Sequence, residues 1–227
     1  MTLDERARID FALYLRLRWT DVIYPALKRQ YHSAGGPMSG LHSPEIETLV
    51  SRLPSFPWFA WIERGGQKML WRSVSDVIEN HWEDIPKLSN ASPKLELDPD
   101  LNLPSWYTDW DIHIQPGGVW RNEKAAHVYE LGAKVVMLGE NDAYSFHTCF
   151  IETGIPKRKY KRIVDLGCGF GKSTWPLKQA FPGAVVMGVD FSEPCLKLAD
   201  YKATSMGLNI FFRQADVNNT RLESGSY

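Results

Sequence analysis

The hydrophobic positions in the last third of the chain fall into short blocks separated by turn residues. Apolar runs at 163–164, 184–190 and 210–216 have the length and composition of buried strands. The segments between them, 172–181 and 192–207, have the spacing and the start and stop residues of helices. This alternation predicts an α/β fold, the βαβαβ first half of a doubly wound sheet.

The preceding part of the chain has the apolar spacing of helices instead. A first helix is expected over 2–31, where Thr2 and Glu5 have the spacing of a capping box. Further helices are expected over 44–53, 57–64 and 66–80. Residues 1–83 are therefore expected to form a helical N-terminal region.

Two segments of different composition follow. Residues 84–105 hold prolines among Asp, Asn and Ser, which cannot sustain a helix or a central strand, so this segment is expected to be a linker. Residues 106–157 are aromatic and turn-prone at first and then predict helices over 121–137 and 141–153. The remaining residues, 158–227, contain the predicted sheet.

Composition excludes several classes of protein. The chain has 227 residues with 44% hydrophobic and 23% charged residues, which is typical of a globular protein with a buried core. A net charge of −1 gives no general reason to expect nucleic acid or a membrane as a partner. The cysteines Cys149, Cys168 and Cys195 are far apart, so neither disulfides nor a metal site are indicated, and a cytoplasmic location is expected.

One glycine-rich stretch, RIVDLGCGFGKST, includes the end of the first predicted strand. A triphosphate-binding loop requires glycine at position 166, where this chain has Leu166. A dinucleotide-binding loop that starts at Gly167 requires a third glycine at position 172, where this chain has Lys172. The spacing is the tighter Gly-x-Gly-x-Gly, which disfavours both types of loop.

The stretch Asp165-Leu-Gly-Cys-Gly-Phe-Gly resembles the first motif of class I S-adenosylmethionine-dependent methyltransferases. In that family a second acid ends the next strand and binds both ribose hydroxyls, and Asp190 stands at that position after AVVMGV. By the same resemblance Phe191 would pack on the adenine face, Asp216 would face the adenine amino group, and Asp165 would orient the loop and reach the cofactor's ammonium group. The resemblance implies a Rossmann-like sheet and S-adenosyl-L-methionine as the cofactor.

The residues that the resemblance assigns to cofactor binding lie at the ends of the predicted strands. They are Asp165, Gly167, Cys168, Gly169, Gly171, Asp190, Phe191, Asp216 and Val217. Glycine lets the loop backbone approach a bulky nucleoside because it lacks a Cβ atom. A carboxylate suits the ribose because it can accept hydrogen bonds from two hydroxyls at once.

The acceptor is expected to be a small molecule, because many small-molecule methyltransferases of this family have a helical lid before the sheet. Residues 106–157 would form that lid. Within it His113, in DWDIHIQPGG, is a candidate base or acceptor contact. Further candidates are Tyr107, Tyr144 and His147.

The resemblance covers residues 160–220 and stops within the expected seven-stranded fold. We therefore expect residues 1–227 to be the N-terminal part of a longer chain, with the first strand left as an apolar edge. Two alternative functions stay open. One is a non-catalytic nucleoside-binding or interaction module with the methyltransferase fold, and the other is an NAD-linked oxidoreductase.

Overall fold

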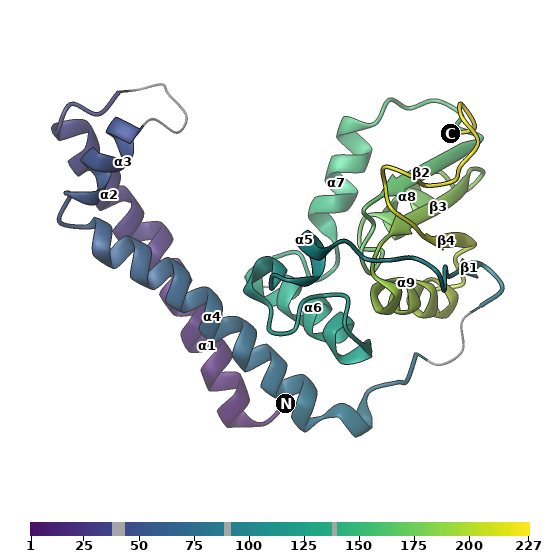
Figure 1. Cartoon of the computed structure of the whole chain (residues 1–227), viewed down its shortest axis with the longest axis horizontal. Coiled ribbons are helices and arrows are strands. Elements are labelled where there is room, and N and C mark those ends of the chain that lie inside the picture. The colour runs from purple at the N-terminus through teal and green to yellow at the C-terminus, as the bar shows by residue number, and fades with distance from the viewer. Residues whose placement is uncertain (38–43, 89–91, 138–139) are drawn as a thin grey trace. The chain divides into compact units, whose positions relative to one another are not determined.

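The structure, a computed structural model, describes residues 1–37, 44–88, 92–137 and 140–227. The chain divides into two compact units, Met1–Val77 and Ile78–Tyr227. The first unit is helical and the second combines a sheet with helices (Figure 1). The expected division into a helical region, a linker, a lid and a cofactor domain stays a prediction.

The first unit is built from long helices. Helix α1 (Leu3–Arg18) continues through a π-helical turn into α2 (Tyr24–Ser33), as expected for 2–31. The predicted capping box is confirmed, because the Glu5 N–H donates to Thr2 Oγ1 at 3.3 Å and the Thr2 N–H donates to Glu5 Oε2 at 2.7 Å. Helix α3 (Pro44–Ser51) also lies where it was predicted.

Helix α4 (Phe56–Asn80) is a single helix, so the prediction of separate helices over 57–64 and 66–80 was wrong. Burial of its apolar face offsets the low helix propensity of the two glycines at 65 and 66. Leu70, Trp71 and Val74 of α4 are buried, as are Ile9 and Ala12 of α1.

The second unit contains a parallel sheet. Its strands are β1 (Leu95–Glu96), β2 (Arg162–Leu166), β3 (Val185–Asp190) and β4 (Ile210–Gln214), in the order β1-β4-β3-β2. Helix α8 (Thr174–Ala180) connects β2 to β3, and α9 (Glu193–Ser205) connects β3 to β4. The predicted βαβαβ succession and α/β fold class are confirmed.

Strand β1 was not predicted. It lies in the proline-containing segment 84–105, where it pairs with β4 through Leu95 and Phe212. Two residues offer no alternating pattern to recognise, and the pairing joins positions more than one hundred residues apart. The segment is also tied to α9, because the Ser92 N–H donates to Asp200 Oδ2 at 2.8 Å. Part of the expected linker therefore packs against the sheet.

Strand β2 lies at the other end of the sheet order. Among the residues that the structure describes it pairs with β3 alone, and its last residue, Leu166, is 52% exposed. Helices α6 (Glu123–Val136) and α7 (Ser145–Gly154) come before β2 in the chain and correspond to the helices predicted over 121–137 and 141–153. Helix α6 contacts α9, and α7 contacts α8.

Because β2, β3 and β4 are parallel, their carboxyl ends lie at one edge of the sheet.

Candidate functional site

The glycine-rich loop follows β2 and turns sharply at each of its glycines. Gly167, Gly169 and Gly171 have φ angles of +75°, +52° and +91°, a region that side chains with a Cβ atom rarely adopt. The N–H groups of Gly167 and Cys168 both donate to the carbonyl oxygen of Val189, at 2.8 and 3.1 Å. The end of β3 therefore holds the start of the loop.

Gly171 allows the loop to pack closely on the helices behind it. A Cβ atom there would lie 2.9 Å from Trp175 Nε1 and 3.2 Å from the Cβ of Ala199. At Gly169 the nearest atom to a Cβ would be Tyr129 Cε1 on α6, at 3.4 Å. At Gly167 nothing lies within 4 Å, so this first turn of the loop has open space beside it.

Asp190 ends β3 and binds the same loop. Its Oδ2 accepts a hydrogen bond from the Gly169 N–H at 2.8 Å, and its Oδ1 accepts one from the Ser192 N–H at 2.9 Å. Burial raises the pKa of this carboxyl, while the backbone hydrogen bonds lower it and the charge of Asp165 raises it further. Each carboxylate oxygen retains capacity for another hydrogen bond, so the group can still accept from a ligand.

Asp165 is a second acid at this edge of the sheet. Its Oδ2 accepts hydrogen bonds from the hydroxyls of Ser173 and Thr174, both at 2.7 Å. Asp165 therefore fixes the start of α8 against the end of β2. Within the residues that the structure describes, both bonds are made to Oδ2, and no protein donor contacts Oδ1, which is available to a ligand.

Phe191, directly after Asp190, packs among aromatic rings. Its ring centroid lies 5.3 Å from that of Tyr107 and 6.0 Å from that of Trp106, both on the short helix α5 (Ser105–Thr108). Burial and the charge of Asp190 raise the pKa of Tyr107, which stays neutral. The rings around Phe191 come from the segment between β1 and β2.

Asp216 lies two residues beyond β4 and forms a local turn. Its Oδ1 accepts hydrogen bonds from the N–H and the side-chain amide of Asn218, at 2.7 and 3.0 Å. Val217, the next residue, is 43% exposed. Asp190 is in register with Gln214 at the end of β4, so Asp216 lies at the same edge of the sheet as Asp190.

Residues 163–227, which contain the glycine-rich loop, Asp165, Asp190, Phe191 and Asp216, match the family model described as a methyltransferase domain. This part of the chain is similar to the class I S-adenosylmethionine-dependent methyltransferases. The predicted resemblance is confirmed.

Curated relatives of this methyltransferase domain differ in what their names say they act on. The chain is 38% identical over 86 residues to trans-aconitate 2-methyltransferase of Deinococcus radiodurans, covering 38% of this chain and 31% of that protein. It is 40% identical over 67 residues to demethylmenaquinone methyltransferase of Thermus thermophilus, covering 30% of each. It thus spans about a third of the length of these relatives. A solved structure, that of MccD protein, aligns with 37% of each chain at 25% identity and a TM-score of 0.32.

The candidate His113 reaches the methyltransferase loop through a neighbouring ring. It has a φ of +59°, and its ring stacks on Tyr129 at a centroid distance of 5.9 Å and an interplanar angle of 11°. Tyr129 in turn contacts the loop at Gly169. The sequence did not identify Tyr129 as a site residue, because it stands among the apolar positions of α6 and has no other distinguishing feature.

Gln214 is another residue that the sequence did not indicate. It is buried at the end of β4, where its side-chain amide donates to the Phe191 carbonyl at 3.0 Å and its Oε1 accepts from the Asp98 N–H at 3.2 Å. Gln214 therefore joins the end of β3 to the segment around β1. Its position at a predicted strand end was the available signal.

The other candidates lie around this loop in different ways. His147 Nδ1 lies 3.1 Å from the side-chain nitrogen of Asn141, and burial lowers the His147 pKa. The Tyr144 ring packs edge-on against Trp175. Cys168 is buried and burial raises the pKa of its thiol, so its backbone is what the loop presents.

In the described part of the chain, no three His, Cys, Asp or Glu side chains are grouped so that they could hold a metal ion. The same residues contain no helix long and apolar enough to cross a membrane.

Proposed function

We propose that this methyltransferase domain binds S-adenosyl-L-methionine at the carboxyl ends of β2, β3 and β4 and methylates a small-molecule acceptor. The observation that carries the proposal is the position of Asp190. Its carboxylate is bonded to the Gly169 N–H at 2.8 Å and retains acceptor capacity on both oxygens. The carboxylate is half-buried and burial raises its pKa, so two further donors would stabilise its charged form.

The residues present fit such a cofactor. Two vicinal ribose hydroxyls would supply the donors that Asp190 lacks, and the open space beside Gly167 would let a nucleoside approach the backbone. Phe191 offers an aromatic face for adenine, and the free acceptor of Asp165 suits an ammonium group. When bound, the cofactor supplies an electrophilic methyl group.

Asp216, Val217 and Cys168 complete the proposed cofactor site. The Asp216 Oδ1 is used by its own turn, so its Oδ2 would accept from the adenine amino group. Val217 and Cys168 would contribute through backbone and apolar contact. In this proposal the protein mainly orients the two reactants, which is the principal requirement of an in-line methyl transfer.

A small-molecule acceptor is supported by the names of two relatives, which refer to trans-aconitate and demethylmenaquinone. His113 is the proposed acceptor contact on this chain, since it lies against Tyr129 beside the loop. In this proposal the acceptor contacts the His113 ring, beside Tyr129.

The test is transfer of a labelled methyl group from S-adenosyl-L-methionine to trans-aconitate and to a short-chain demethylmenaquinone. Labelled product that is lost on addition of S-adenosylhomocysteine supports the proposal. Tight binding of S-adenosylhomocysteine without transfer to any acceptor favours the non-catalytic module. Binding of NAD without binding of S-adenosylhomocysteine overturns the cofactor assignment.

A further inference from the structure

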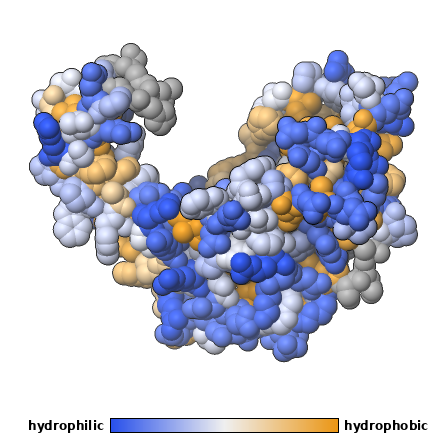
Figure 2. All heavy atoms as spheres, in the orientation of Figure 1, coloured by the Kyte–Doolittle hydropathy of each residue, from blue (hydrophilic) through white to orange (hydrophobic). Residues whose placement is uncertain are grey.

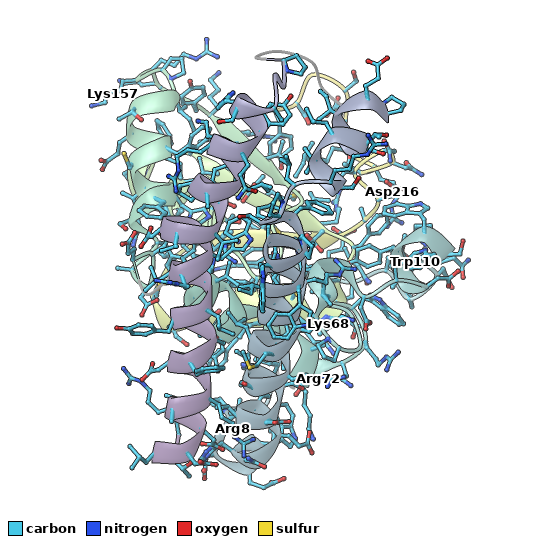
Figure 3. All side chains as sticks on the ribbon, turned by 90° about the vertical axis from the view of Figure 1, so that its left-hand side faces the viewer. Arg8, Lys68, Arg72, Trp110, Lys157 and Asp216 are labelled. Carbon is cyan, nitrogen blue, oxygen red and sulfur yellow. The ribbon has the colours of Figure 1, made fainter. Side chains whose placement is uncertain are left out.

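A groove between α1 and α4 in the first unit has an unusual distribution of charge. It has a volume of about 600 Å³ and is lined on α4 by Lys68 and Arg72 and on α1 by Arg8. Figure 3 shows Lys68 and Arg72 on α4, with Arg8 on the neighbouring α1. The volume is within the range of small-molecule sites.

Asp76, the acid that lines the groove, lies close to Arg8 and leaves Lys68 and Arg72 without a carboxylate partner among the described residues. Asp76 is one turn beyond Arg72 on α4, but its Oδ2 lies 3.7 Å from Arg8 Nη1 across the groove. Arg8 also pairs with Asp4 at 3.1 Å. Across the described ranges neither Lys68 nor Arg72 has a carboxylate partner. The groove therefore carries uncompensated positive charge on its α4 side.

This arrangement is unfavourable for the helix alone. Lys68 and Arg72 are four residues apart, about 6 Å along the axis, and like charges at that spacing destabilise a helix. By contrast, Arg6 on α1 is paired with Asp10 at 3.2 Å. An anion between the two cations would turn this repulsion into attraction, since an arginine fork matches carboxylate and phosphate oxygens.

The rest of the groove is apolar. Phe11 of α1 is 58% exposed, and Met69 and Ala7 line the groove beside it. Gly65 also lines it, and a Cβ there would meet nothing within 4 Å. Figure 2 shows hydrophobic residues at the surface of this unit among hydrophilic ones. Charge and apolar surface thus lie in one concave site.

We propose that this groove binds an amphipathic organic anion, with a phosphate or carboxylate head on Lys68 and Arg72 and a hydrocarbon or aromatic part on Phe11. All lining residues of the groove belong to the first unit, whereas the proposed cofactor site is formed by residues of the second unit. Binding to the groove can therefore be measured without any assay of methyl transfer.

The test is calorimetric titration of decyl phosphate, below its critical micelle concentration, into the protein of residues 1–227. Wild-type protein should bind decyl phosphate, and Lys68→Gln with Arg72→Gln should bind it at least ten-fold more weakly. The matched control, Lys28→Gln with Arg29→Gln, removes the same charges from exposed positions on α2 outside the groove and should change affinity less than two-fold. Equal affinity for both double variants would overturn the proposal.

Further probes separate the two parts of the ligand. Phe11→Ala should weaken decyl phosphate binding but leave inorganic phosphate binding unchanged. Decanol, which lacks the charge, should bind at least ten-fold more weakly than decyl phosphate, and equal affinity would contradict an anion site. Because the variants change exposed side chains, their circular dichroism should match that of wild type.

Vesicles distinguish a free ligand from a lipid headgroup. If the groove binds a lipid headgroup, wild-type protein should float with phosphatidylcholine vesicles that contain phosphatidic acid but not with vesicles of phosphatidylcholine alone. The Lys68→Gln, Arg72→Gln variant should then not float with either. Binding of decyl phosphate without flotation assigns the groove to a free ligand. The absence of both decyl phosphate binding and vesicle flotation would overturn the proposal.

Discussion

The carboxylate of Asp190, the last residue of β3, accepts a hydrogen bond from the N–H of Gly169 in the loop after β2, at 2.8 Å. This bond joins two sequence motifs that are 21 residues apart. Because of this bond, Asp190 and the glycine-rich loop fix each other's position. A substitution in either should therefore displace both. The Val189 carbonyl, which accepts from Gly167 and Cys168, supports the same junction.

Replacement of Gly171 tests how tightly the loop packs. Gly171→Ala combines an unfavourable φ of +91° with a Cβ atom 2.9 Å from Trp175 Nε1, so we expect a loss of about 1–3 kcal/mol in the free energy of unfolding. Urea denaturation followed by tryptophan fluorescence measures it.

The matched control is Gly183→Ala in the turn before β3, where a Cβ would meet nothing within 4 Å. Its stability should stay within about 0.5 kcal/mol of wild type. Similar effects at both glycines would show that the close contact at Gly171 is not what requires glycine there.

The sequence predicted the sheet well because each strand end carries a local signal. Asp165 and Asp190 directly follow apolar runs, and the glycines between them mark a sharp turn. Contacts between distant segments had no such signal. The bond from Gly169 to Asp190, the pairing of β1 with β4 and the stacking of His113 on Tyr129 depend on tertiary packing, which spacing along the chain does not encode.

Asp216 shows the same limit in another way. Its position after the third predicted strand indicated a ligand contact, whereas its Oδ1 closes a turn with Asn218. An aspartate at a strand end can either close a turn or contact a ligand, and the sequence does not distinguish these two roles. The role of Asp216 toward adenine stays a proposal.

His127 on α6 should make stability depend on pH. Burial and the charge of Lys202 lower its pKa from 6.5 to about 4, so the folded protein resists protonation. As the pH falls from about 6.5 to about 4, the unfolded chain takes up a proton that the folded chain does not. Stability should therefore fall, by an amount of the order of 2–3 kcal/mol.

His127→Gln removes this titration. Urea denaturation at pH 7.5 and pH 5 should show a smaller difference for the variant than for wild type. An identical pH dependence in the two proteins would mean that His127 is not held neutral by burial.

Ser92 should anchor the segment around β1. Its N–H and hydroxyl donate to the two oxygens of the buried Asp200, at 2.8 and 2.5 Å. Ser92→Ala removes one of these donors from a buried carboxylate, and we expect a loss of about 1–3 kcal/mol in stability. Ser205→Ala, which removes an exposed hydroxyl at the end of α9, is the control and should have little effect. Equal losses would indicate that the Ser92 segment is not held by Asp200.

The role of Asp190 in binding a ribose can be separated from its role in holding the loop. S-adenosylhomocysteine and its 2′-deoxy analogue differ by one hydroxyl. Wild-type protein should bind the deoxy analogue about ten-fold more weakly, whereas Asp190→Ala, which has already lost the acceptor, should not distinguish the two ligands.

The most direct measurement of the central claim is calorimetric titration of S-adenosylhomocysteine into wild type and Asp190→Ala. The account predicts binding to wild type and a loss of at least about ten-fold in affinity in the variant, equivalent to about 1.4 kcal/mol. Equal affinity for the two proteins would contradict the assignment of Asp190, and with it the proposed cofactor site.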